Sequence, residues 1–137
     1  MSTTARTKAF EFRLDIRSGV PVYRQIIDQV MGGIASGTLA GGDQLPTVRQ
    51  VAVDLSINPN TVMRAYRELE IRGVLDTQQG TGTFISHQKV ERDEVEQQRQ
   101  LNQLVGEFVA RAGSAGFTVE DLLERLHDVQ TEVGKNR

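Results

Sequence analysis

Apolar residues recur at every third or fourth position after Pro21, and Gly37 ends the run. Proline suits the first turn of a helix, and glycine suits the position just after its end. The pattern therefore predicts a helix between these two residues. The stripe that this helix buries is Val22, Ile26, Ile27, Val30 and Ile34.

Two shorter segments flank this helix. FEFRLDI, residues 10–16, alternates apolar and polar side chains, which is typical of a strand or of an ordered arm. TLAGGDQLP, residues 38–46, is rich in turn-forming residues. It predicts a connector that Leu39 and Leu45 anchor in the core.

Two short helices joined by a tight turn are predicted next. Thr47 can cap the first, which ends near Ser56. Asn58 or Asn60 can cap the second, with Gly73 as its C-cap. The buried residues are predicted to be Val48, Val51, Ala52 and Leu55 in the first helix and Val62, Ala65, Tyr66 and Leu69 in the second. Two short helices in this order form a helix-turn-helix.

The second of these helices also has a polar face, made of Asn60, Thr61, Arg64 and Arg67. Amide, hydroxyl and guanidinium groups can pair with base edges and phosphates in a major groove of DNA. The alternative is an ordinary surface, on which the polar residues cap the helix and the arginines are solvated.

VLDTQQGTGTFI, residues 74–85, predicts a β-hairpin behind the two helices. A short strand leads into a glycine turn at Gly80 and Gly82, and a second strand ends in Phe84 and Ile85. A phosphate-binding loop would need a following helix and a Lys-Ser/Thr pair, and both are missing from the pattern. The hairpin is therefore interpreted as the wing of a winged helix.

The last third of the chain predicts two amphipathic helices. SHQKVERDEVEQQRQ, residues 86–100, is polar and suits an exposed linker or the entry of a helix. Gly113 and Gly116 separate the two helices, and Thr118 can cap the second with Asp121 three residues on. The apolar stripes are Leu101, Leu104, Val105, Phe108, Val109 and Ala112 in the first, and Val119, Leu122, Leu123, Leu126 and Val129 in the second.

One hairpin of two short helices cannot bury both stripes, so a partner chain is expected to cover them. The predicted dimerisation residues are Leu101, Leu104, Val105, Phe108, Leu122, Leu123 and Leu126. The alternative is that these helices pack against the N-terminal part of the same chain.

Composition excludes several classes of function. The 137 residues are 38% hydrophobic and 25% charged, which suits one soluble domain plus an appendage. There is no cysteine, and His87 and His127 lie 40 residues apart, so neither thiol chemistry nor a metal site is expected. No catalytic grouping or cofactor loop emerges, so we expect no enzyme and no cofactor.

The chain is not expected to meet a membrane. No stretch approaches the roughly 18 apolar residues of a membrane span. The start, MSTTARTKAFEF, lacks the apolar core and cleavage pattern of a signal peptide. We therefore expect a cytoplasmic protein.

Charge is distributed unevenly within a net charge of −2. Residues 1–86 hold nine Lys or Arg against eight Asp or Glu, and residues 87–137 hold seven against ten. Exposed charges interact only over a short Debye length, so a local basic stripe can still favour nucleic acid.

PVYRQIIDQV, residues 21–30, and SGTLAGGDQLPTVRQVAVDLSINPNTVMRAYRELEIRGVLDTQQGTGTFI, residues 36–85, together resemble a known family. GDQLPTVRQVA, NPNTVMRAYRELE and GTGTF follow in the order and spacing of the winged-helix DNA-binding domain of the GntR family of bacterial transcription regulators. The resemblance spans residues 12–86. The short remainder resembles the YtrA-like branch, whose C-terminal part is a small helical dimerisation unit.

The resemblance implies roles for individual residues. Arg49 matches an arginine that commonly contacts DNA in this family, and Thr61 matches a threonine at the start of the recognition helix. Many relatives carry arginines where this chain has Pro59 and Met63. The candidate DNA-binding residues are therefore Thr47, Arg49, Asn58, Asn60, Thr61, Arg64, Arg67, Gln79 and Gly80, the last two at the wing tip that reaches the minor groove.

The expected fold is mostly α-helical with a small β-hairpin wing. It consists of an N-terminal winged helix-turn-helix domain, residues 1–86, and a short C-terminal two-helix dimerisation region, residues 87–137. The expected function is that of a homodimeric repressor of transcription that binds double-stranded operator DNA with an inverted repeat. The alternative is a winged-helix module that binds another protein without specific DNA binding. A small-molecule effector, if there is one, would need a pocket between subunits.

Overall fold

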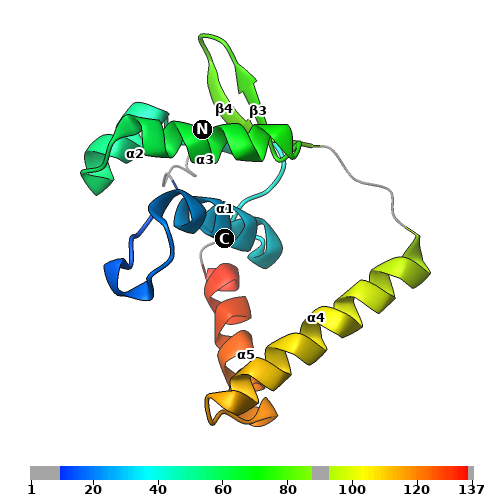
Figure 1. Ribbon diagram of the computed structural model, residues 1–137. Coiled ribbons are helices and arrows are strands. Elements are labelled where there is room, and N and C mark those ends of the chain that lie inside the picture. Colours follow the sequence, from blue (N-terminus) through cyan, green and yellow to red (C-terminus); the bar gives the residue numbers. More distant parts are fainter. Residues whose placement is uncertain (1–9, 88–92, 136–137) are drawn as a thin grey trace. The chain divides into compact units, whose positions relative to one another are not determined.

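The computed structural model describes residues 10–87 and 93–135 (Figure 1). The chain divides into two compact units, whose described parts are these two ranges.

The first long helix, α1, spans Val22–Ser36. Pro21 precedes it, and Gly37 caps its C-terminus in the left-handed conformation, with φ of 86°. Its buried residues are Ile26, Ile27, Val30 and Gly33. This confirms the predicted stripe, with Val22 and Ile34 half-buried at its two ends.

The FEFRLDI segment is an arm that lies along α1 and leads into a short 3-10 helix, η1 (Ile16–Ser18). The side-chain amide of Gln29 exchanges two hydrogen bonds with the backbone of Arg13, at 2.9 and 2.6 Å. Gln25 exchanges two with the backbone of Asp15, at 2.8 and 3.0 Å. These side-chain amides form the hydrogen bonds with the backbone that a neighbouring strand would otherwise form. Of the two predicted alternatives, the segment is therefore an ordered arm and not a strand.

The helix-turn-helix consists of α2 (Val48–Leu55) and α3 (Pro59–Ile71). Ser56 makes the turn between them in the left-handed conformation, with φ of 56°. Asn58 is the cap of α3, which decides between the two predicted caps, because its side chain accepts a hydrogen bond from the backbone of Asn60. The C-cap of α3 lies one residue before the predicted Gly73.

The sheet has three antiparallel strands in the order β2-β4-β3. They are β2 (Gln44–Leu45), β3 (Leu75–Gln78) and β4 (Gly82–Ile85). The hairpin of β3 and β4 confirms the predicted wing. The sequence did not predict β2, because two residues in a connector are too short to show alternation.

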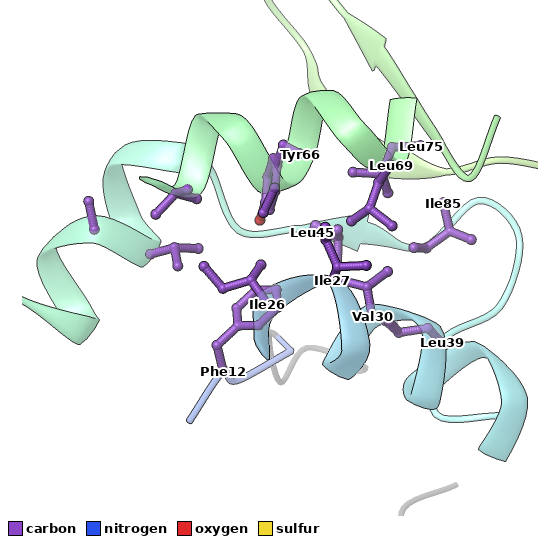
Figure 2. Close-up of a cluster of buried hydrophobic side chains, with 14 residues drawn as sticks. Phe12, Ile26, Ile27, Val30, Leu39, Leu45, Tyr66, Leu69, Leu75 and Ile85 are labelled. Carbon is purple, nitrogen blue, oxygen red and sulfur yellow. The ribbon is translucent and has the colours of Figure 1, made fainter. Parts of the chain in front are cut away.

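The core of this unit joins α1 and α3 (Figure 2). Phe12 of the arm, Leu39 and Leu45 of the connector, and the predicted buried residues of α3 all belong to it. The Tyr66 hydroxyl donates a hydrogen bond of 2.6 Å to the carbonyl oxygen of Pro46, just before α2. Burial raises the pKa of this hydroxyl well above its ordinary value.

The second unit contains α4 (Glu94–Ser114) and α5 (Val119–Lys135). Thr118 and Asp121 exchange hydrogen bonds of 2.9 and 3.2 Å at the start of α5, which confirms the predicted cap. The polar stretch contains the start of α4, which was one of its two predicted roles, and Asp93 caps the helix there. The helix continues one residue past Gly113, which was predicted to end it.

These elements confirm the predicted fold class, a mostly helical chain with a small β wing. Among the described residues, no helix is long and apolar enough to cross a membrane.

Replacement of Tyr66 by Phe is expected to lower the free energy of unfolding by about 1–2 kcal/mol, because the Pro46 carbonyl loses its buried partner. The wild type should also lose stability as the pH rises above about 10, since the unfolded chain ionises this tyrosine while the native state holds it protonated. Chemical denaturation at several pH values measures both effects.

Tyr23→Phe is the matched control, because no hydrogen bond of its hydroxyl is found among the described residues. An equal loss in both variants would contradict the assigned role of Tyr66.

Candidate nucleic-acid interface

The face of α3 that lies opposite the core carries the predicted recognition residues. Asn60, Arg64 and Arg67 are exposed, and Thr61 is half-buried. Burial of every third or fourth residue of α3 fixes this orientation, because a helix buried on one side presents the other to solvent. Asn60, Arg64 and Arg67 therefore occupy the predicted outward positions, whereas Thr61 is only partly exposed.

Two predicted contacts act as helix caps. Asn58 uses its side-chain oxygen to cap α3, which leaves its amide donors exposed. Thr47 forms a capping box at α2: its hydroxyl accepts a hydrogen bond of 3.1 Å from the backbone of Gln50 and lies 3.3 Å from the Gln50 side-chain oxygen. The Thr47 hydroxyl is thus engaged within α2, although the residue is exposed.

Arg49, Arg64 and Arg67 carry charges that no carboxylate neutralises among residues 10–87 and 93–131. The ion pairs observed in the first unit involve other arginines: Arg24 lies 3.5 Å from Asp28, and Arg72 lies 3.4 Å from Glu68. The unpaired cations of α2 and α3 thus belong to the candidate face, in a unit whose formal charge is near neutral.

Arg64 lies against α1. Its guanidinium carbon is 3.8 Å from the centroid of the Tyr23 ring, within the range of a cation–π contact. The sequence did not predict a role for Tyr23, because the contact joins residues about forty positions apart that share no pattern.

Two side-chain hydrogen bonds brace the wing. The Thr77 hydroxyl donates a hydrogen bond of 2.6 Å to the carboxylate of Glu70 in α3. The Gln44 side-chain amide donates one of 3.2 Å to the carbonyl oxygen of Thr81. Gly82 has φ of 138°, and a side chain there would collide with Gln44, so only glycine permits this brace. The tip residues Gln79 and Gly80 are exposed.

Apolar side chains also stand on the exposed surface of the two helices. Met63 of α3 is 48% exposed, Val53 of α2 71% and Ile71 of α3 73%. The periodicity predicted the buried residues of α3, but of those predicted in α2 Val48 and Leu55 are only half-buried. It did not show that Val53 and Ile71 would remain exposed.

The predicted dimerisation residues of α4 and α5 are exposed with one exception. Leu101, Leu104, Val105 and Phe108 of α4 and Leu123 and Leu126 of α5 are each about half-exposed or more. Leu122 is half-buried. In Figure 1 the two helices diverge from the turn that joins them.

Among the described residues, no group of three or more histidine, aspartate or glutamate side chains is placed to hold a metal ion. The candidate face offers hydrogen-bonding groups, positive charge and apolar side chains.

Comparison with known proteins gives consistent matches. Residues 22–85 match the family model of bacterial regulatory proteins, gntR family. The chain is 38% identical over 110 residues to the HTH-type transcriptional regulator YhcF of Bacillus subtilis (strain 168). The alignment covers 80% of this chain and 90% of YhcF. The chain is 38% identical over 121 residues to the HTH-type transcriptional repressor YtrA of the same strain, covering 88% and 93%. A crystal structure of a transcriptional regulator from Oenococcus oeni matches with a TM-score of 0.55 at 35% identity, covering 85% of this chain and 96% of that one.

Replacement of Thr47 by Asp is expected to separate capping from DNA contact. Aspartate is as good an N-cap as threonine, so the free energy of unfolding should change by less than about 0.5 kcal/mol. The added negative charge at α2 should weaken binding to duplex DNA by about tenfold through repulsion of the phosphates. Thermal unfolding and fluorescence anisotropy measure the two effects.

Thr118→Asp is the matched control, because it places the same charge on the equivalent cap of α5. It should leave DNA affinity unchanged. If Thr47→Asp binds DNA as tightly as the wild type, the start of α2 does not face DNA.

Proposed function

The chain belongs to the gntR family of bacterial regulatory proteins, and on this basis we propose that it acts as a homodimeric repressor that binds an inverted-repeat operator. Its membership of this family makes it a DNA-binding transcriptional regulator and not an enzyme. The repressor role is proposed from its similarity to the repressor YtrA, of which the chain covers 93%. A cytoplasmic location is part of the same proposal, because operator DNA lies there.

One observation carries the DNA-binding role: α3 presents exposed amide and guanidinium groups on one face while its other face is fully buried. Such a helix can enter a major groove without disturbing the core. The wing, braced at Gln44 and Glu70, holds Gln79 and Gly80 where a minor-groove contact is proposed.

The proposal of a dimer is supported by the apolar stripes of α4 and α5. Leu104 is 62% exposed and Leu123 is 61% exposed, although both follow the spacing of buried positions. Completing the burial of a half-exposed leucine contributes about 1 kcal/mol. In a two-fold contact both subunits contribute this burial free energy. The same contact offers the place between subunits where an effector pocket could form.

In vitro selection of bound duplexes from a random pool tests the proposed function. The full-length chain should enrich one inverted repeat, with half-sites about 10 base pairs apart if the two recognition helices meet successive major grooves. Enrichment of a single unrepeated site, or of none, would contradict the proposal.

Arg49→Ala is expected to weaken binding to the selected operator and to an unrelated duplex alike. Arg49 lies exposed in the first turn of α2, where a phosphate contact is expected. The slope of log affinity against log salt should become shallower by about one unit. Affinities measured at five salt concentrations give the slope. An unaltered slope would count against a phosphate contact, and a general absence of salt dependence would favour the protein-binding alternative.

Replacement of both Leu104 and Phe108 by Glu is expected to yield a folded monomer, because charges then occupy the middle of the α4 stripe. Operator affinity should fall by about 10²–10⁴, since the second half-site is no longer bound intramolecularly. Light scattering at micromolar concentration and binding titrations measure the two effects.

Gln103→Glu adds one negative charge to α4 on the side away from the stripe and should leave the dimer intact. The dimer proposal is wrong if the wild type is monomeric at this concentration. It is also wrong if the double variant remains a dimer.

A further inference from the structure

Arg64 is held at the flank of α3. Its guanidinium lies over the ring of Tyr23 in the first turn of α1, with 3.8 Å between the guanidinium carbon and the ring centroid. A planar guanidinium that stacks on an aromatic face is oriented by it, while the N–H donors along its edge remain available. Tyr23 thus limits how far Arg64 extends from the helix.

A surface hollow surrounds this pair. It is lined by Tyr23, Arg24, Ile27, Arg64, Glu68 and Arg72. Three guanidinium groups therefore meet one carboxylate at the hollow. The carboxylate of Glu68 already pairs with Arg72, and Arg24 pairs with Asp28 on α1. The uncompensated charge is that of Arg64, which favours an anionic acceptor from outside the chain.

The position of Arg64 distinguishes between the two acceptors that DNA offers. A bidentate contact with guanine requires an arginine that extends from the helix to the base edges. Phosphates line the edges of the groove and can be reached from the flank of a helix that lies in it. A side chain held against α1 is suited to the second acceptor. The neighbouring Arg24 and Arg72 add positive potential that acts on a phosphate without direct contact.

We propose that Arg64, positioned by Tyr23, binds one phosphodiester group of the DNA backbone at the edge of the major groove and does not read a base. This inference rests on the proposed function, because it requires α3 to lie in the major groove. Base reading then falls to the other exposed polar residues of α3, Asn60 and Arg67, with Met63 beside them.

The role of Arg64 is tested with the full-length chain, an operator selected from the random pool and a scrambled duplex of equal length. Arg64→Ala should weaken binding by about tenfold on both duplexes, so that the ratio of the two affinities is unchanged. The salt slope should become shallower by about one unit. Arg125→Ala removes the same charge from α5 and should change neither quantity. Relaxed preference at one base pair of the operator in Arg64→Ala would overturn the proposal.

The role of Tyr23 is tested by comparing its effect with and without Arg64. Tyr23→Phe keeps the ring and should bind within about twofold of the wild type, whereas Tyr23→Leu should lose about as much affinity as Arg64→Ala. In the Arg64→Ala background, Tyr23→Leu should cause no further loss, because the two residues act as one unit. A multiplicative loss in the double variant would refute the positioning role.

NMR spectroscopy of the wild type tests the contact between Tyr23 and Arg64 directly. This test does not depend on whether a Tyr23 variant folds. Ring currents of Tyr23 should displace the side-chain resonances of Arg64 upfield in the free protein and in the operator complex. Loss of this displacement on binding the operator would show that Arg64 leaves the ring, which contradicts the proposal. Failure to select any operator would instead contradict the proposed function, so the two failures are distinguishable.

Discussion

Burial of one face of α3 against α1 is the constraint on which the rest of the DNA-binding unit depends. Val62, Ala65 and Leu69 are fully buried, and each large apolar side chain that leaves water contributes about 1.5–3 kcal/mol. A rotation of α3 about its axis would expose this stripe, so the direction of the opposite face is determined by the core. The core thus sets the direction of the polar face of α3, and the contact with Tyr23 then positions Arg64 within it.

Tyr66 extends this constraint from α3 to α2. It is the aromatic member of the buried stripe, and its hydroxyl reaches the carbonyl of Pro46, the residue before the Thr47 cap. The position at which α2 begins is therefore tied to the rotation of α3. The wing is tied to the same helix at its other end, through Thr77 and Glu70. One buried surface thus sets the arrangement of both helices and the hairpin that the proposed DNA contact requires.

The parts of this arrangement that could be predicted from sequence are those determined locally. Pro21 and Gly37 predicted the ends of α1, and Thr118 predicted the start of α5, because caps act on backbone groups within one turn. The strand β2 could not be predicted, since a two-residue strand is specified by its partner β4 and not by its own pattern. The sequence left open whether the polar stretch before Leu101 is a linker or the entry of α4, because polar residues form a helix as readily as a linker. The Tyr23–Arg64 contact was missed for a related reason: it depends on the packing of α1 against α3, to which sequence spacing gives no clue.

The two units meet different physical demands. The first buries its core within one chain and carries near-neutral charge, so we expect few phosphate contacts and only modest affinity for DNA from a single unit. The second leaves side chains such as Leu104 and Leu123 exposed along two amphipathic helices, an arrangement that is favourable only when another apolar surface covers them. A DNA-binding face with few charges gains the most affinity when two copies bind the same DNA together, because avidity multiplies affinities that are modest individually. The proposed two-fold assembly on DNA would account for both the exposed stripes of the second unit and the sparse charge of the first.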